Sequence, residues 1–282
     1  MSIFLRFPGG RSKTLTLSYD DGVSQDVRLI AIMLEHGLKG TFNLNSGLYA
    51  PDGFEFPISE KVHRMTRSEC LRTYMNSGME VACHGLTHSF LDRLPSNMCT
   101  YEILMDRLQL EQDYARIIRG MAYPFGTFND QVINILKRCG IVYARTVEST
   151  EQFDLPTDWL RLPATCHHDN PHLMELAKDF VETPANRTPK MFYLWGHSYE
   201  FDVHNNWSII ERFAQYMGRR NEIWYATNIE IYNYVSAFSQ LEFSTDGKYV
   251  HNPSGTTLYF AEWVSNEIQK VYCVSPDETI VI

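Results

Sequence analysis

The chain has 282 residues, of which 44% are hydrophobic and 13% aromatic, a composition typical of a globular protein with a large core. Its net charge of -9 and its lack of any Lys/Arg cluster argue against nucleic acid and anionic membranes as partners. No apolar run approaches the ~20 residues that cross a bilayer. The N-terminal sequence lacks the features of a signal peptide. We therefore expect a cytoplasmic protein, or an extracytoplasmic one if an export signal has been removed.

Strand-like and helix-like segments alternate over residues 1–240. The expected strands cover residues 13–19, 40–45, 79–85, 121–124, 141–146, 190–196 and 222–227. The expected helices cover residues 24–37, 67–78, 96–120, 129–140, 172–182, 206–217 and 228–239. This alternation indicates parallel pairing and an α/β fold with about seven βα units. An open doubly wound sheet and a closed barrel both fit that count.

The sequence changes character after residue 240. Short β-like runs are separated by turn sequences such as "TDG", "NPSG" and "SPDE", and no helical pattern remains. We therefore expect two parts, a barrel or sheet over residues 1–240 and a small antiparallel β appendage over residues 241–282.

Polar groups follow several of the expected strands directly. Two adjacent aspartates end the first strand, a "CHGLTH" sequence ends the third, "YPFG" ends the fourth and a histidine ends the sixth. These groups are Asp20 and Asp21, His84 and His88, Tyr123 and Phe125, and His197. Each is unremarkable alone, since Asp-Gly and Pro-Phe-Gly are ordinary turn sequences. Because the carboxyl ends of parallel strands form the active face of α/β folds, we expect them to converge on one site.

The residue types at this face suit a divalent metal ion. Two histidines spaced H-x3-H can reach one ion, and a carboxylate completes a three-ligand site with positions left for water and substrate. The second aspartate is then free to accept a proton. A cation also offsets the repulsion between two neighbouring carboxylates. The residues alone thus predict a metal-assisted hydrolase.

The ordered motifs resemble those of the polysaccharide deacetylases of the NodB-homology type, carbohydrate esterase family four. The resemblance covers residues 13–240 and rests on Ser18-Tyr19-Asp20-Asp21-Gly22, His84-Gly85-Leu86-Thr87-His88, Ala122-Tyr123-Pro124-Phe125-Gly126 and, more loosely, Leu194-Trp195-Gly196-His197. It implies a distorted (β/α)7 barrel that binds a divalent metal, usually zinc. Such Asp-His-His sites also accept cobalt, manganese or nickel.

The resemblance also implies a role for each residue. Asp21, His84 and His88 would bind the metal, Asp20 would be the general base, and His197 the general acid. The backbone N–H of Phe125 would stabilise the oxyanion. The implied reaction removes N- or O-acetyl groups from an acetylated sugar or oligosaccharide. The aromatic side chains of Tyr123, Phe125 and Trp195 are candidates for stacking on sugar rings, with Trp195 favoured.

The sequence departs from the family motifs at three places. Ala122 stands where the family has an arginine, and we hypothesise that Arg145 orients Asp20 instead. Gly85 stands where the family prefers Ser or Thr. An extra residue precedes His197, so His167 and His168 are competitors for the role of general acid.

Two other functions fit the same residues. One is hydrolysis of a small non-sugar amide, because the same site suits any carbonyl. The other is carbohydrate binding without catalysis, which the missing arginine favours and the complete Asp20, Asp21, His84 and His88 set opposes. The C-terminal appendage could mediate assembly or glycan binding. The sequence does not predict the oligomeric state.

Overall fold

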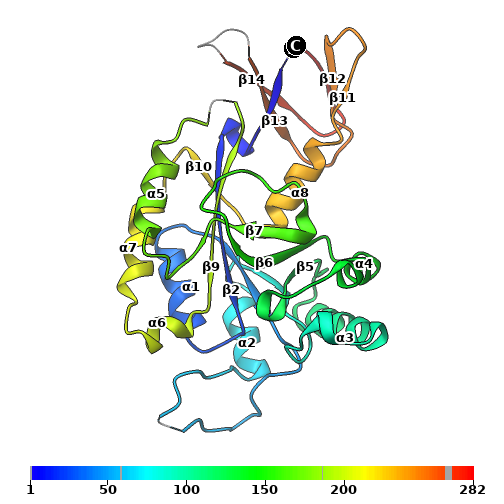
Figure 1. Cartoon of the computed structure of the whole chain (residues 1–282). Coiled ribbons are helices and arrows are strands. Elements are labelled where there is room, and N and C mark those ends of the chain that lie inside the picture. The colour runs from blue at the N-terminus through cyan, green and yellow to red at the C-terminus, as the bar shows by residue number, and fades with distance from the viewer. Residues whose placement is uncertain (1, 58, 186, 264–268) are drawn as a thin grey trace.

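A parallel sheet wrapped by helices forms the main body of the molecule (Figure 1). The computed structural model describes residues 2–57, 59–185, 187–263 and 269–282. The strands of the parallel sheet are β2 (Lys13–Asp20), β3 (Gly40–Leu44), β4 (Glu80–Cys83), β5 (Gly120–Ala122), β6 (Tyr143–Ser149), β7 (Leu162–Ala164), β8 (Cys166–His167), β9 (Lys190–Gly196) and β10 (Ile223–Tyr225). The helices are α1 (Asp26–Glu35), α2 (Arg67–Tyr74), α3 (Ser96–Tyr114), α4 (Asp130–Arg138), α5 (Leu173–Glu182), α6 (Tyr199–Val203), α7 (Ser208–Met217) and α8 (Asn228–Phe238).

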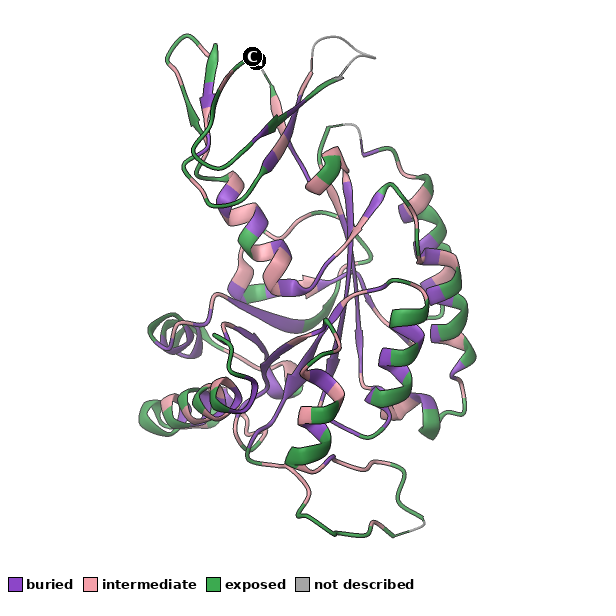
Figure 2. Ribbon diagram, turned by 180° about the vertical axis from the view of Figure 1, so that it is seen from behind, coloured by how far each residue is buried: buried purple, intermediate pink, exposed green. Residues whose placement is uncertain are grey.

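The strands are buried and the outer helix faces are exposed (Figure 2). All residues of β2 are buried, as expected for a strand covered on both faces. Side-chain caps fix several helix starts: Asn129 accepts a hydrogen bond from the amide of Val132, and Thr227 forms a capping box with Glu230. Among the helices of the described residues, none combines the length and apolar character needed to cross a membrane.

The sheet closes into a barrel through the segment that holds β7 and β8. In the strand order β7-β6-β5-β4-β3-β2-β9-β8 these two strands lie at opposite ends, although only Thr165 separates them in the chain. The amide of Thr165 donates to the carbonyl of Tyr193 at 2.9 Å, and the amide of Tyr193 donates to the Thr165 hydroxyl at 3.0 Å. Counted as one interrupted strand, β7–β8 completes a ring of seven with β2 to β6 and β9. The distorted (β/α)7 barrel is therefore confirmed.

An antiparallel β structure follows α8, as predicted. It consists of two three-stranded sheets, with orders β1-β13-β14 and β11-β12-β15 in the described part of the chain. Their strands are β1 (Ile3–Arg6), β11 (Glu242–Phe243), β12 (Tyr249–His251), β13 (Leu258–Trp263), β14 (Gln269–Val274) and β15 (Thr279–Val281). The sequence did not predict β1, which pairs with β13 rather than with the barrel. The boundary between residues 240 and 241 stays a prediction, but the first strand lies with the C-terminal ones.

The residue after β1 anchors this sheet to the barrel. Phe7 is 0% exposed and its ring centroid lies 5.6 Å from that of Trp224 and 6.2 Å from that of Tyr234. These contacts join β1 to β10 and α8.

We expect Phe7→Ala to lower the free energy of unfolding by about 3–5 kcal/mol, because it empties a closed aromatic site. Urea unfolding followed by circular dichroism measures this change. Phe54→Ala is the matched control, since Phe54 is 54% exposed and its loss should change stability by about 0.5 kcal/mol or less. Equal effects of the two replacements would show that β1 is not anchored in this way.

Candidate active site

The predicted groups line one cavity at the carboxyl ends of the barrel strands. Its volume is about 300 Å³. The lining residues are Asp20, Asp21, His84, His88, Tyr123, Phe125, Gly126, Val147, Trp195, His197 and Tyr199. They follow or end β2, β4, β5, β6 and β9, which is the convergence that the strand-end positions predict. Eight of the nine predicted site residues are in this lining, and the ninth, Arg145, lies beneath it.

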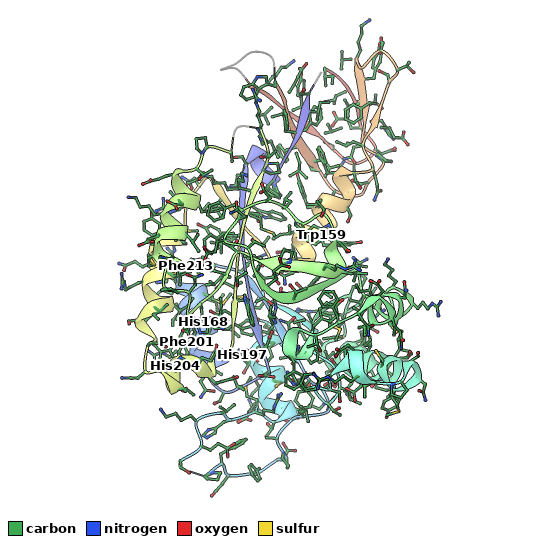
Figure 3. The ribbon with its side chains drawn as sticks, in the orientation of Figure 1. Trp159, His168, His197, Phe201, His204 and Phe213 are labelled. Atoms are coloured by element: carbon green, nitrogen blue, oxygen red, sulfur yellow. The ribbon has the colours of Figure 1, made fainter. Side chains whose placement is uncertain are left out.

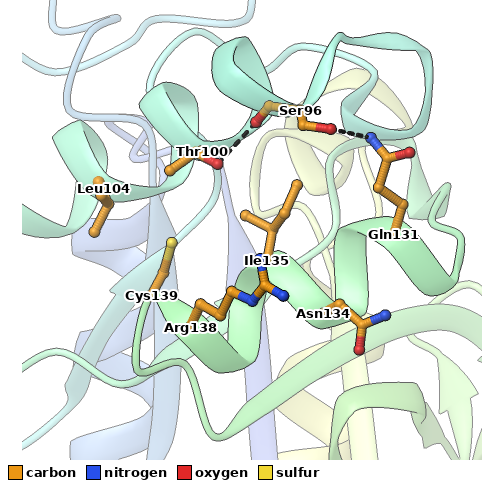
Figure 4. A pocket seen from close by; sticks show the side chains of 8 residues that line it. All are labelled: Ser96, Thr100, Leu104, Gln131, Asn134, Ile135, Arg138 and Cys139. Atoms are coloured by element: carbon orange, nitrogen blue, oxygen red, sulfur yellow. Dashed lines mark hydrogen bonds between the residues drawn. The ribbon is translucent and has the colours of Figure 1, made fainter.

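A larger hollow of about 640 Å³ lies between α3 and α4 (Figure 4). Three of its polar side chains, Ser96, Thr100 and Gln131, are joined in local hydrogen bonds. The Thr100 hydroxyl donates to the Ser96 carbonyl at 2.7 Å, and the Gln131 amide donates to the Ser96 hydroxyl at 2.9 Å. The smaller cavity, with its converging carboxylates and imidazoles, is the better candidate for chemistry.

Asp21, His84 and His88 form a cluster that suits a metal ion. Their ligand atoms all lie within 4.8 Å of one another. His84 Nδ1 lies 2.8 Å from the carbonyl of Ala122, so this nitrogen carries the proton and donates it. The lone pair is then on Nε2, which is buried and has no hydrogen-bond partner among the described residues. An orphaned imidazole nitrogen facing a carboxylate and a second imidazole fits a divalent cation.

Strained turns aim these side chains into the cavity. Asp21 has φ 84°, His88 has φ 53° and Phe125 has φ 58°, all in the left-handed region that non-glycine residues seldom adopt. Each follows or ends a turn after a different strand, β2, β4 or β5. Backbone strain of this kind gathers at functional sites, where the surrounding structure maintains it.

Burial keeps both histidines of the cluster neutral. Desolvation lowers the pKa of His84, and desolvation together with the nearby His84 lowers the pKa of His88 to about 4. Both imidazoles therefore hold a free lone pair at neutral pH, the state in which they bind metals.

Arg145 forms a buried ion pair with Asp20 at the floor of the cavity. Arg145 is 1% exposed, and its Nη2 contacts Asp20 Oδ2. In the register of β5 and β6, Arg145 is paired with Ala122, so the arginine lies one strand away from the position that the family motif predicts. Its guanidinium also lies 4.4 Å from the ring centroid of Trp195. The side-chain amide of Asn43 donates to the other oxygen of Asp20 at 2.8 Å.

These partners keep Asp20 ionised. Burial alone would raise the pKa of Asp20, but the positive charge of Arg145, with His84 and His197, lowers it to about 2. The carboxylate is held by hydrogen bonds on both oxygens, and at neutral pH it can accept a proton.

His197 approaches the same oxygen of this carboxylate as Arg145. Its Nε2 is 3.8 Å from Asp20 Oδ2, and its Nδ1 is 3.3 Å from Glu200 Oε1. Burial would lower the pKa of His197, but Glu200 and Asp20 raise it overall. The competing residues His167 and His168 are absent from the cavity lining, and the Nε2 atoms of both lie 3.2 Å from Glu200 Oε2.

The three predicted aromatic residues differ in how far they are available to a ligand. Tyr123 is buried, and its hydroxyl donates to the Leu160 carbonyl at 2.8 Å. Trp195 is also buried, with Arg145 over one face. Phe125 is 50% exposed and stacks on Phe90. Sugar stacking therefore suits Phe125 better than Trp195, the residue that the sequence favoured.

Three residues of the site were not predicted from the sequence. Arg64 donates to Asp21 Oδ1 at 2.8 Å and to the Asp21 carbonyl at 2.7 Å, which offsets the charge of that carboxylate. Asn43 and Glu200 contact the two proposed catalytic groups. Of these three residues, only Glu200 could have been found from the sequence. It follows His197 by three residues, the spacing at which side chains on a helical turn are neighbours.

Comparison with known proteins confirms the resemblance. Residues 8–144 match the sequence model of the polysaccharide deacetylase family. Over this part of the chain, which holds the first three motifs, the protein carries the sequence pattern of that family. Among curated proteins, none matches the sequence.

Solved structures share the fold at low sequence identity. A polysaccharide deacetylase candidate from Mycobacterium smegmatis is 14% identical with a TM-score of 0.58, and the match covers 83% of this chain and 94% of that one. A family 4 acetyl xylan esterase from Clostridium thermocellum, in complex with a cobalt ion, is 12% identical with a TM-score of 0.51, covering 78% and 90%. A Streptococcus pyogenes deacetylase in complex with acetate is 20% identical with a TM-score of 0.41. The match covers 47% of this chain and 55% of that one, so this chain spans only about half of the Streptococcus pyogenes protein.

We expect Asp21→Ala, His84→Ala and His88→Ala each to remove one equivalent of bound divalent ion, because a three-ligand site that loses one ligand no longer retains its metal. Elemental analysis of protein equilibrated with zinc and dialysed measures this. His172→Ala is the control, since that histidine is exposed and pairs only with Glu175. Retention of full metal content by the three site variants would contradict the assignment.

Proposed function

We propose that this protein is a metal-dependent hydrolase that removes N- or O-acetyl groups from a carbohydrate. The observation that carries this proposal is the gathering of Asp20, Asp21, His84, His88 and His197 in one cavity at the carboxyl ends of the strands. The family match of residues 8–144 supports a carbohydrate substrate.

Asp21, His84 and His88 would hold the metal. When bound, a divalent ion there supplies a Lewis acid that polarises the acetyl carbonyl and makes water a stronger nucleophile. Zinc is the proposed ion, with cobalt, manganese or nickel as alternatives. The cobalt ion in the acetyl xylan esterase of similar fold supports this range.

Asp20 and His197 divide the proton transfers. Asp20, ionised and held by Arg145 and Asn43, accepts a proton from the attacking water. His197, whose pKa is raised by Glu200 and Asp20 against the effect of burial, keeps a proton nearer to neutral pH. It can therefore protonate the leaving amine or alcohol. The two groups lie 3.8 Å apart, close enough to act on one reacting centre.

The mouth of the cavity suits a sugar ring. The half-exposed ring of Phe125 offers an apolar face, and its backbone N–H is the proposed donor to the developing oxyanion. We propose an acetylated sugar or oligosaccharide as substrate.

We expect the protein to release acetate from acetylated sugar oligomers, and His197→Ala and Asp20→Asn to lower kcat by about 10²–10⁴-fold, the usual contribution of one positioned acid or base. An enzyme-coupled acetate assay measures this. His167→Ala is the matched control, because His167 contacts Glu200 but does not line the cavity.

Other outcomes would replace the proposal. Full activity of His197→Ala would remove that residue from its role. Turnover of small N-acetyl amides without turnover of sugars would indicate an amidohydrolase. Sugar binding without acetate release would indicate a carbohydrate-binding relative.

We expect Arg145→Ala to reduce turnover sharply while metal content stays unchanged, since Arg145 contacts Asp20 and not the metal cluster. Because Arg145 lowers the pKa of Asp20, its removal should also move the acidic limb of the kcat/KM profile to higher pH. Arg145→Lys, which keeps the charge, should restore part of that shift. Unchanged turnover in Arg145→Ala would exclude a positioning role.

A further inference from the structure

A second group of metal-ligating side chains lies behind the cavity. The ligand atoms of His167, His168, Asp169 and Glu200 all lie within 4.8 Å of one another. The group joins the end of β8 to α6, and His168 extends the strand because its amide donates to the Trp195 carbonyl at 2.9 Å. Figure 3 shows the position of His168 beside Phe201. This group shares no residue with the Asp21, His84 and His88 cluster.

Packing fixes the orientation of the His168 ring. The side chain is 0% exposed and lies between Tyr19, with ring centroids 5.8 Å apart, and Phe201, at 4.2 Å. Gly196 touches its Nδ1 edge so closely that a Cβ at position 196 would stand 2.1 Å from that nitrogen. The ring therefore cannot turn, and its Nε2 faces the two carboxylates.

His168 Nε2 has two acidic neighbours but no hydrogen bond. It lies 3.2 Å from Glu200 Oε2 and 3.4 Å from Asp169 Oδ1, yet neither of its ring nitrogens makes a hydrogen bond to any described residue. A buried imidazole without a hydrogen-bond partner is unfavourable unless another group satisfies its lone pair. The ring is aimed at a point that a cation would fill.

His167 is a neighbour of this point but not a ligand. The amide of Asp169 donates to His167 Nδ1 at 3.2 Å, which places the lone pair on Nδ1 and the proton on Nε2. That proton faces Glu200 Oε2, 3.2 Å away. The lone pairs directed at the site are those of His168, Asp169 and Glu200, whose Oε2 also accepts a hydrogen bond from the backbone amide of His197 at 3.1 Å.

We propose that His168, Asp169 and Glu200 form a second divalent-cation site. Bonds of about 2.0–2.1 Å in a tetrahedral site place ligand atoms about 3.3 Å apart, close to the 3.2 and 3.4 Å observed from His168 Nε2. Two carboxylates balance the charge of a divalent ion, and both are partly exposed, which leaves a path for the ion and for water ligands.

Neighbouring side chains contact both oxygens of Asp169, including the one that faces His168, and the second oxygen of Glu200. His204 Nδ1 lies 3.1 Å from Asp169 Oδ2, and the Asn206 amide donates to Asp169 Oδ1 at 3.3 Å. His197 Nδ1 faces Glu200 Oε1. Such outer contacts orient the ligands of metal sites. The second ion would join β8 to α6 and does not depend on the proposed function.

The test is a count of ions in whole protein that has been treated with a chelator, equilibrated with zinc and dialysed. We expect two ions per chain in wild type and one in Asp169→Asn, which keeps shape but loses a carboxylate at a partly exposed position. We expect one ion in His84→Ala/His88→Ala and none when the three replacements are combined. Glu175→Gln is the matched control, because it alters an exposed His–Glu pair, and it should keep two.

The outcomes separate this site from the first one. No ion in wild type, an unchanged count in Asp169→Asn, or no ion in His84→Ala/His88→Ala would each overturn the proposal. Cobalt absorption of His84→Ala/His88→Ala provides a second measurement, since a cobalt ion held by His168 should give a visible spectrum that Asp169→Asn abolishes. Absence of acetate release with unchanged ion counts would be a failure of the proposed function alone. A wild-type count of one that falls to zero in Asp169→Asn would support the second site without the first.

Discussion

The buried ion pair between Asp20 and Arg145 is the interaction around which the site is arranged. Removing one member of such a pair leaves an uncompensated charge that costs about 3–5 kcal/mol. The pair links the end of β2 to β6 across the barrel interior, and it positions Trp195 against the guanidinium. The small side chain of Ala122, paired with Arg145 in register, is consistent with an arginine that has moved to the neighbouring strand.

Two adjacent aspartates have different surroundings, and this difference explains why both are present. Asp20 points into the barrel, where Arg145 and Asn43 hold it. Asp21, in a left-handed conformation, turns the other way toward His88 and Arg64. The alternation of a strand would direct neighbouring side chains to opposite faces, and the strained turn brings both carboxylates to one cavity. Two carboxylates in unlike environments can take different roles in one reaction.

Long elements and strand-end motifs could be predicted from the sequence, whereas short and non-local features could not. The strand at 13–20 and the histidine loop after β4 carry strong local patterns. The strand pair β7–β8 has so few residues that periodicity cannot identify it, yet it closes the barrel. Arg64 comes from a long loop whose path depends on tertiary contacts. The sequence suggested that Arg145, on the strand after the one that ends at Ala122, takes the place of the missing motif arginine. Only the register of β5 and β6 shows that the two residues lie side by side.

The pairing of β1 with β13 joins segments from opposite ends of the chain. Contacts between residues so far apart in sequence form late, because the intervening chain must be ordered first. During synthesis, the first barrel strands can pair while β1 is still unpaired, because the ribosome has not yet made β13. Phe7 can dock only when Trp224 and Tyr234 have been made, shortly before β13, and β13 then covers an edge of β1 that otherwise stays open to another chain.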